Sequence, residues 1–209
     1  MGFYSTLWLY PTSQVLSKGF IVQERMDCPF CTIAEGAKPE ARPQPTGEST
    51  VFLSTPHVVG FFDIQPLVSA ETHVLIIPRK HYETLDELSG DAQTAGALGI
   101  ALSRAARALK EVFGAKAFNV VQNNGSAAGQ VVNHVHFHLV IRPWKRTEKL
   151  AQSVGVATEL AQKTHLTMAE RASYSALVFG RGQRQDLDLG WAQAIIPEIT
   201  EALDRVSKL

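Results

Sequence analysis

Three histidines alternate with apolar residues in the stretch His134-Val135-His136-Phe137-His138. In an extended strand, neighbouring side chains point to opposite faces, so the three imidazoles would share one face over about 13 Å. Such a face can bind a metal ion, bind an anion, or carry out proton and phosphoryl transfer. A strand with accidental polar residues on its solvent side explains the pattern poorly, because three of the chain's seven histidines fall within five positions.

A loop of small residues precedes the histidines. Residues 125–129 read Gly-Ser-Ala-Ala-Gly, and such a loop lets the backbone approach an anion and turn successive N–H groups inward. Asn123 and Gln130 add neutral donors, and Arg142 and Lys145 add positive charge. Loops of this composition are most often simple turns, but the direct junction with the histidines favours phosphate binding.

A catalytic zinc centre on all three histidines is an alternative use of the same face. It needs an open coordination position for water and nearby carboxylates that orient the ligands. The nearest acidic residues along the chain are Glu111 and Glu148, so this segment brings no obvious carboxylate of its own.

The pair Cys28-Pro29-Phe30-Cys31 has three interpretations. A redox dithiol requires a strand directly before it and a long helix directly after it, and Gly36 with the prolines that follow shortens that helix. Two unrelated buried thiols are the second interpretation. Half of a zinc site is the third, and it requires two further ligands.

The segment 129–140 resembles the signature of the histidine triad superfamily, His-φ-His-φ-His-φ-φ with φ apolar. Further segments resemble its nucleotide-binding branch in the same order: the zinc-binding start at 28–31, the ribose-contacting segment at 61–66, the central strand at 73–81 and the phosphate loop at 123–130. We therefore expect an N-terminal extension (1–27), a histidine triad nucleotide-binding core (28–142) and a C-terminal extension (143–209).

The resemblance implies an α+β fold, the histidine triad fold, in which an antiparallel sheet carries a long helix; here a C-terminal helical extension follows. It also implies a homodimer and an enzyme with a two-step reaction. His136 would attack the α-phosphate of a nucleotide, and water would cleave the nucleotidyl-histidine. His138 would balance charge on the α-phosphate, and His134 completes the catalytic set.

The resemblance further implies how the ligands are held. Asp63 would accept hydrogen bonds from ribose hydroxyls, and Phe61 and Ile64 would pack the base, although such residues often serve only the core. The other expected nucleotide-binding residues are Asn123, Ser126, Gly129, Gln130 and His138. Zn²⁺ would be bound by Cys28, Cys31, His81 and His134 in a structural site, since four protein ligands leave no open position. No organic cofactor is expected.

The expected substrate is a nucleoside phosphoramidate or a related AMP adduct, with a purine base. A diadenosine polyphosphate hydrolase and a non-catalytic nucleotide-binding module remain alternatives. Some members of the superfamily carry Ser or Thr where this chain has Val131. Because valine cannot donate a proton to a leaving group, a phosphoramidate amine would be the leaving group most affected.

Hydrophobic periodicity predicts the elements that position these residues. Strands are expected at 51–53, 58–64, 74–78, 118–122 and 133–142, with 74–78 buried at the centre. A long helix is expected from Asp91 to Phe113, with Ser89 as its N-cap and Gly114 ending it. A terminal helix at 188–208 contains Pro197, which must start, kink or split it.

Overall composition excludes several partners. The 209 residues include 20 basic and 20 acidic side chains, so the basic surplus that nucleic-acid polymers or anionic membranes require is missing. No apolar run reaches the roughly 18 residues of a membrane span. Two closely spaced cysteines favour a reducing compartment, hence a cytoplasmic or nuclear location. A mitochondrial location stays open, because the segment before Glu24 is free of acidic residues but poor in arginine.

Overall fold

The structure is a computed structural model that describes residues 28–39, 43, 47–142, 165–172 and 184–207. The expected N-terminal extension lies outside these residues, as do residues 143–164, 173–183 and 208–209 of the expected C-terminal extension.

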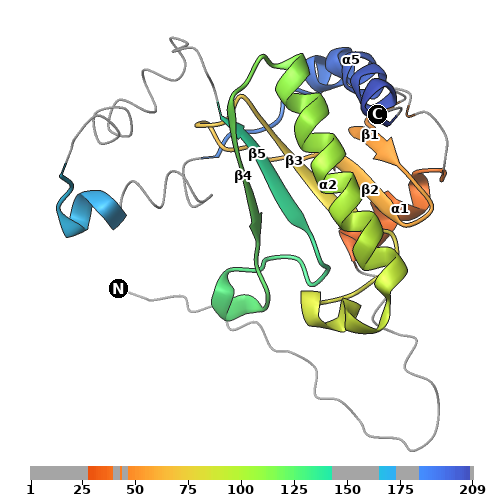
Figure 1. The fold of residues 1–209 in the computed structure, drawn as a ribbon, viewed down its shortest axis with the longest axis horizontal. Coiled ribbons are helices and arrows are strands. Elements are labelled where there is room, and N and C mark those ends of the chain that lie inside the picture. Colours follow the sequence, from red (N-terminus) through yellow and green to blue (C-terminus); the bar gives the residue numbers. More distant parts are fainter. Residues whose placement is uncertain (1–27, 40–42, 44–46, 143–164, 173–183, 208–209) are drawn as a thin grey trace, which may run out of the picture.

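Five antiparallel strands form one sheet in the order β1-β2-β3-β5-β4 (Figure 1). Their bounds are β1 Val51–Ser54, β2 Val58–Phe62, β3 Thr72–Pro78, β4 Ala117–Gln122 and β5 Phe137–Arg142. Every residue of β3 is buried, which confirms the prediction of a central strand from its continuous apolar run.

Strand β5 is shorter than expected, because it begins at Phe137 rather than at residue 133. The register explains the difference: Phe137 pairs with Ile76 on β3 and with Gln122 on β4, and neither ladder continues toward residue 136. The backbone before it finds other partners, since the Val135 N–H donates to the Tyr82 carbonyl at 2.7 Å. Only His138 therefore lies in the strand, and His134 and His136 precede it.

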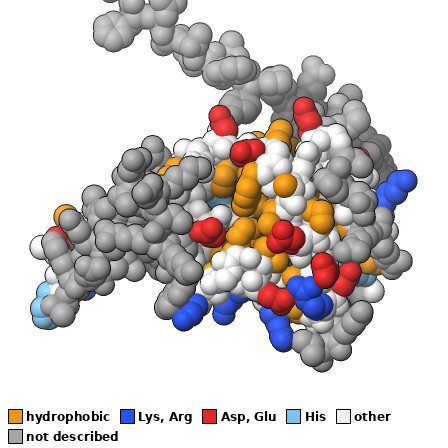
Figure 2. All heavy atoms as spheres, turned by 90° about the horizontal axis from the view of Figure 1, so that it is seen from above, with side chains coloured by type: hydrophobic (Ala, Val, Ile, Leu, Met, Phe, Trp, Pro, Cys, Tyr) orange, Lys and Arg blue, Asp and Glu red, His pale blue; other side chains and the backbone are white. Residues whose placement is uncertain are grey.

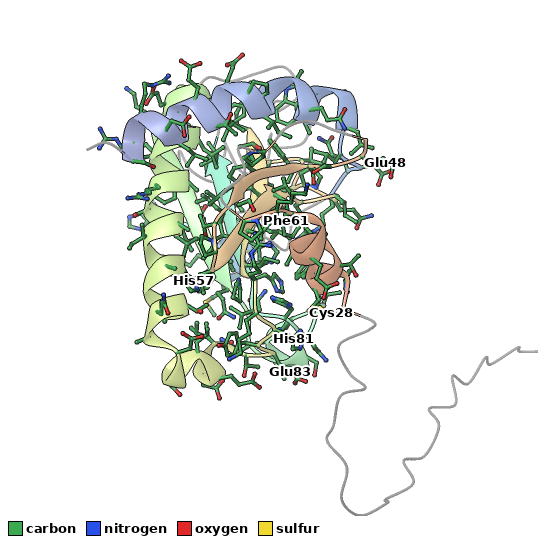
Figure 3. The ribbon with its side chains drawn as sticks, turned by 90° about the vertical axis from the view of Figure 1, so that its right-hand side faces the viewer. Cys28, Glu48, His57, Phe61, His81 and Glu83 are labelled. Carbon is green, nitrogen blue, oxygen red and sulfur yellow. The ribbon has the colours of Figure 1, made fainter. Side chains whose placement is uncertain are left out.

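Helices cover both faces of the sheet. Helices α2 (Ala92–Val112) and α5 (Leu189–Ser207) pack on one face, and the short helix α1 (Pro29–Gly36) packs on the other (Figure 3). Strand β3 serves both layers, because Val74 and Ile76 belong to the first core cluster while Leu75 and Ile77 belong to the second. Val135 and Leu139 enter the first cluster, as the alternation of the histidine segment predicts.

Asp91 caps helix α2, so the prediction of Ser89 as N-cap was wrong. The Asp91 carboxylate accepts the Thr94 N–H at 3.0 Å, and Ser89 lies within the preceding 3-10 helix η1 (Leu85–Gly90). Asp and Ser are comparable caps, and the buried Tyr82 decides between them by donating its hydroxyl to Asp91 Oδ2 at 2.6 Å. Gly114 follows the helix with φ +59°, a left-handed conformation that favours glycine.

Helix α5 runs through Pro197 without interruption, so the proline neither starts nor splits it. Proline removes one backbone hydrogen bond, and burial of Ile196, Ile199 and Leu203 against the sheet and α2 supports the helix around it. At the end of the molecule that carries α5, hydrophobic side chains form a band bordered by acidic and basic groups (Figure 2). In the described part of the chain, no helix combines the length and apolar character that a membrane span requires.

Gly60 on β2 tests the packing of this sheet. A Cβ there would lie 2.9 Å from Ile76 Cδ1 and 3.1 Å from Phe52 Cζ and Leu53 Cβ. We expect Gly60→Ala to lower the free energy of unfolding by about 1–3 kcal/mol, because overpacking a dense core is costly. Urea unfolding measures the change. The control, Gly99→Ala on α2, meets nothing within 4 Å and should stabilise by up to about 1 kcal/mol; equal effects of the two variants would contradict the prediction.

Candidate active site

A cavity of about 420 Å³ opens on the α1 side of the sheet. It is bounded by α1, by the loop after β2, by the loop after β4 and by the β5 side chains that face away from α2. The wall is mostly apolar, and His136, His138, Asp63, Asn123 and Arg184 supply most of its polar groups. Such a pocket, with few polar groups directed at one place, is the usual form of a small-ligand site.

His136 presents Nε2 as its free ring nitrogen. Its Nδ1 lies 2.7 Å from the backbone carbonyl of His134, and because a carbonyl only accepts, Nδ1 must carry the proton. Burial lowers the pKa of His136, against the opposing effects of that hydrogen bond and of Asp63. The imidazole is therefore neutral near pH 7, with an unprotonated Nε2, which is the nucleophilic form.

His138 is oriented by a chain of hydrogen bonds that starts at the backbone. The Leu67 N–H donates to His73 Nδ1 at 3.3 Å, so the remaining proton of His73 is on Nε2. That Nε2 lies 3.0 Å from His138 Nδ1, which must accept. The proton of His138 is therefore on Nε2, the position from which it can donate to an oxyanion.

Both members of this chain stay neutral. Burial, followed by the charges of Arg184 and Arg142, lowers the pKa of His73 to about 3. Burial, followed by His73 and His136, lowers the pKa of His138 to about 3. The donor on His138 is therefore a neutral imidazole across the physiological pH range.

The ring nitrogens of His73 and His138 and the carboxylate of Asp63 lie within 4.8 Å of one another, as three metal ligands would. The hydrogen bonds argue against a metal there. His73 already accepts the Leu67 N–H on Nδ1, so its Nε2 keeps a proton and cannot bind a cation, and Arg184 lies 3.0 Å from Asp63 Oδ2. We interpret this group as a hydrogen-bond network.

The loop 123–130 is placed differently from the expectation. Asn123 and Gly129 line the cavity, but Ser126 and Gln130 do not. The Gln130 amide is used inside the loop: its Oε1 accepts the Gly125 N–H at 2.6 Å, and its Nε2 donates to the Glu83 and Val132 carbonyls. The Gln130 amide therefore holds the loop together, and its expected contact with the phosphate stays a prediction.

The backbone of this loop also departs from the expected anion nest. The N–H groups of Gly125, Ala128, Gly129 and Gln130 are all bonded within the loop. Ser126 is exposed at the start of a 3-10 turn. These four amides are thus already used in closing the loop, whereas His136, His138 and Asn123 are polar residues that line the cavity.

The remaining nucleotide-binding candidates line the cavity. Asp63 is buried, and its Oδ1 accepts the Gln65 N–H at 2.9 Å. Phe61 is buried in the second core cluster, whereas Ile64 is 71% exposed at the rim. An exposed isoleucine beside a cavity offers an apolar surface to a planar base.

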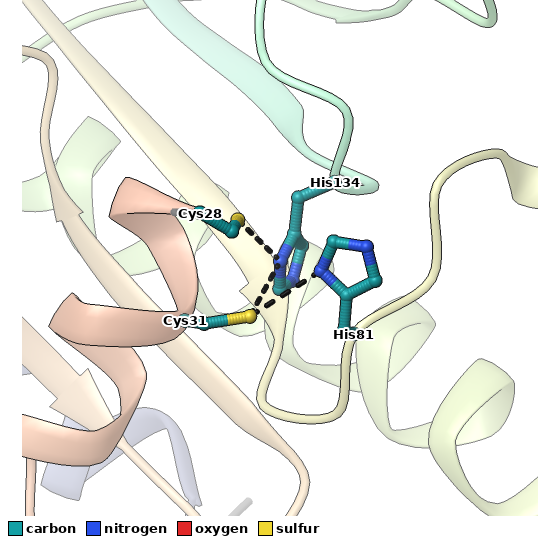
Figure 4. A group of neighbouring side chains, drawn as sticks. All are labelled: Cys28, Cys31, His81 and His134. Carbon is teal, nitrogen blue, oxygen red and sulfur yellow. Dashed lines mark hydrogen bonds between the residues drawn. The ribbon is translucent and has the colours of Figure 1, made fainter. Parts of the chain in front are cut away.

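The four expected metal ligands come together (Figure 4). His134 Nδ1 lies 3.5 Å from Cys28 Sγ and 3.6 Å from Cys31 Sγ, and His81 Nδ1 lies 3.3 Å from Cys31 Sγ. The other nitrogen of His134 lies 2.9 Å from the Pro78 carbonyl, the type of outer partner that orients a metal-binding histidine. Two thiols and two imidazoles fit tetrahedral zinc.

His134 is fully buried and does not line the cavity. Both ring nitrogens already have partners in the cysteine cluster and at Pro78, so its ring cannot touch a ligand of His136. We therefore correct its expected catalytic role: His134 positions the ring of His136 through its backbone carbonyl. A zinc centre on all three histidines is likewise not formed, since among the described residues His136 belongs to neither metal-type cluster.

Sequence reasoning undervalued two residues of this site. His73 entered the sequence analysis only as the first residue of the segment 73–81, yet it determines the tautomer of His138. Arg184 comes from the C-terminal segment and reaches Asp63. The only signal in the sequence is the basic stretch Arg-Gly-Gln-Arg at 181–184, and charge alone does not say which carboxylate an arginine meets.

Comparison with known proteins gives a consistent result. A family model described as "HIT domain" matches residues 44–143. An uncharacterised HIT-like protein of Methanocaldococcus jannaschii is 37% identical over 115 residues, which are 55% of this chain and 78% of that protein. An adenosine 5′-monophosphoramidase of Saccharomyces cerevisiae is 38% identical over 61% of this chain and 68% of its own length. An adenylylsulfatase of Arabidopsis thaliana is 34% identical over 56% of this chain and 52% of its own length.

Solved structures show the same fold. A histidine triad nucleotide-binding protein from Sulfolobus tokodaii aligns over 86% of this chain and 94% of its own, with a TM-score of 0.58 and 18% identity. A zinc-bound histidine triad family protein from Mycobacterium smegmatis aligns over 88% of this chain and 98% of its own, with a TM-score of 0.54 and 23% identity. With this fold, and with relatives above 30% identity matched over most of their length, the chain belongs to the histidine triad (HIT) family.

Proposed function

We propose that this protein is a nucleotide hydrolase or transferase that cleaves nucleoside phosphoramidates or related AMP adducts at the α-phosphate. The observation that carries the proposal is the free Nε2 of a neutral His136 at the wall of the cavity. The similarity to adenosine 5′-monophosphoramidases of three yeasts supports the choice of substrate, and the apolar wall beside Asp63 suits a purine nucleoside.

The chemistry follows from the two tautomers. Nε2 of His136 attacks the α-phosphorus, so a phosphorus–nitrogen bond forms as the bond to the leaving group breaks. The Nε2–H of His138 donates to an α-phosphate oxygen and stabilises the charge that develops there. The leaving amine takes up a proton from solvent. Water then attacks the nucleotidyl-histidine, so a phosphorus–oxygen bond forms as the phosphorus–nitrogen bond breaks, the proton that water loses returns to solvent, and Nε2 of His136 is free again.

Val131 favours a second candidate among the leaving groups. It is 91% exposed and lines the cavity without a proton to donate. A leaving group that departs as an anion, such as the nucleotide of a diadenosine polyphosphate or the sulfate of an adenylyl sulfate, needs that proton least. The Arabidopsis relative named adenylylsulfatase is in keeping with this candidate.

We expect His136→Ala to lower turnover of adenosine 5′-phosphoramidate by at least about a thousandfold, because the nucleophile is lost. AMP binding should persist, since the other cavity residues remain. Acid-quenched mass spectrometry of the wild-type protein should detect an adenylyl group on His136. His165→Ala, at an exposed histidine, is the matched control and should behave as wild type.

The same assay ranks the candidates. Phosphoramidate, diadenosine tri- and tetraphosphate and adenylyl sulfate are compared by kcat/KM. Comparable turnover in His136→Ala would refute the nucleophile, and a preference for the polyphosphates would replace the first candidate by the second. Nucleotide binding without any turnover or adduct would leave the non-catalytic module.

We also propose that Cys28, Cys31, His81 and His134 bind a structural zinc ion. The support is the gathering of four ligand atoms and the partner of His134 at Pro78. When bound, zinc would join the start of α1 to the turn before β5. Arg79 already ties the end of that helix, because its guanidinium donates to the Ala34 and Ala37 carbonyls.

We expect the purified protein to hold one zinc ion per chain by elemental analysis, and Cys28→Ser and Cys31→Ser to lose it. Because metal binding contributes to folding, the variants should melt at least about 5 °C lower. His57→Ala, outside the cluster, should keep its zinc. Variants with unchanged zinc content would exclude this ligand set.

We further propose that the protein is a homodimer built on the outer edge of β4. Within the described residues β4 pairs on one side only, and an open edge invites another chain. Phe118 and Val120 belong to this strand, and they are 39% and 46% exposed. Two apolar side chains on one face of an edge strand are typical of a covered surface.

We expect Val120→Lys to convert the dimer to a monomer, because a lysine would be buried without a partner at the interface. Light scattering coupled to size exclusion gives the mass of each species. Met168→Lys, at a highly exposed methionine, should leave the mass unchanged. A wild-type protein that is already monomeric would overturn the proposal.

A further inference from the structure

The C-terminal segment is bonded to the loop that carries Asp63. The Leu187 N–H donates to the Ile64 carbonyl at 2.9 Å, and the Gln185 N–H donates to the Pro66 carbonyl at 3.1 Å. Arg184 also pairs with Leu67 in an isolated antiparallel bridge. Residues 184–187 therefore add a short extended piece to the rim of the cavity.

This arrangement brings the Arg184 guanidinium to the buried carboxylate of Asp63. Its Nη1 donates to Asp63 Oδ2 at 3.0 Å and to the Gln65 carbonyl at 2.6 Å. A buried carboxylate is costly without a cationic partner, and the nearby His73 is neutral. Arg184 is the cation that offsets the burial of Asp63.

Asp63 keeps acceptor capacity at the wall of the cavity. An ionised carboxylate offers about four lone-pair positions. The Gln65 N–H uses one on Oδ1, and Arg184 uses one on Oδ2. His73 Nε2 also lies 3.5 Å from Oδ2, but its proton is directed to His138 at 3.0 Å. Asp63 lines the cavity, so about two positions are left for hydroxyl donors, which suits a vicinal diol.

We propose that Arg184 is a positioning residue that holds Asp63 to accept the ribose hydroxyls, and that it thereby sets a preference for ribonucleotides over 2′-deoxyribonucleotides. This inference rests on the proposed function, in which the cavity binds a nucleoside monophosphate unit. It makes the C-terminal segment part of the nucleotide site. The positive charge of Arg184 also acts on the hydrogen-bond chain of His73 and His138, because it adds to burial in lowering the pKa of His73.

Calorimetric binding to the full chain tests the proposal with AMP and 2′-deoxy-AMP. The wild-type protein should favour AMP by about tenfold, since a hydrogen bond to a charged group is lost in the deoxy compound. Arg184→Met should bring that preference to about twofold or less by weakening AMP binding alone. Arg184→Lys keeps the charge without the forked contact and should retain only part of the preference.

Two controls separate positioning from a general loss of structure. Arg205→Met removes an arginine that pairs with Glu111 and Glu201 away from the cavity-lining residues, and it should keep the full preference. Asp63→Asn should lose the preference, and adding Arg184→Met to it should weaken AMP binding no further, because the arginine acts through Asp63.

Turnover gives an independent measurement. With adenosine 5′-phosphoramidate, Arg184→Met should raise KM about tenfold while kcat changes less than about threefold. A wild-type protein without the ribose preference, or an Arg184→Met protein that keeps it or loses both ligands equally, would overturn the inference. Failure of the proposed function would look different: the binding preference would persist while no nucleotidyl-histidine formed.

Discussion

The carbonyl of His134 accepts the Nδ1–H of His136 at 2.7 Å, and this hydrogen bond decides which nitrogen of His136 faces the cavity. The carbonyl itself is held by the ring of its own residue, because His134 is fixed on one side by two thiols and on the other by Pro78. Chemistry at His136 thus depends on a cluster that has no direct access to a ligand. Moving the His134 ring would move the acceptor, and the tautomer of His136 would no longer be defined.

The same cluster builds one wall of the cavity. Phe30 lies between Cys28 and Cys31, and its ring packs edge-on to His134 and His136, with centroids at 5.9 and 5.2 Å. Helix α1 has only eight residues, too few to be stable alone. Its position depends on the cysteines at its start and on Arg79 at its end, so the apolar wall and the nucleophile share one anchor.

Local patterns in the sequence predicted much of this arrangement. The continuous apolar run of 74–78 identified the central strand. The spacing of Cys28 and Cys31 indicated half of a metal site, and the resemblance to the histidine triad superfamily supplied His81 and His134, which lie with them in the structure. The start of β5 was missed, because the end of a strand is determined by where its neighbours stop pairing. The contacts of Gln130 could not be predicted for a similar reason: its amide suits a phosphate, and only the folded loop shows that it bonds to three backbone groups.

Residues distant in sequence were the hardest to predict. Arg184 and Asp63 are 121 positions apart, and neither local periodicity nor composition links them. His73 has an ordinary position in an apolar strand, and its role follows only from the backbone N–H of Leu67 on one side and His138 on the other. Such roles come from contact geometry rather than from residue type.

The alternation of β3 has a consequence for how this protein can change over time. His73, Leu75 and Ile77 face the cavity side, while Val74 and Ile76 face the two long helices. An insertion or deletion of one codon within this strand would exchange the two sets downstream of the change. A change just before His73 would turn its imidazole toward the helices and out of the hydrogen-bond chain with His138, and it would move the aliphatic residues that follow into the opposite core layer. Length variation among descendants of this gene should therefore spare β3 and accumulate in the surface loops, where side chains do not have to alternate between two buried faces.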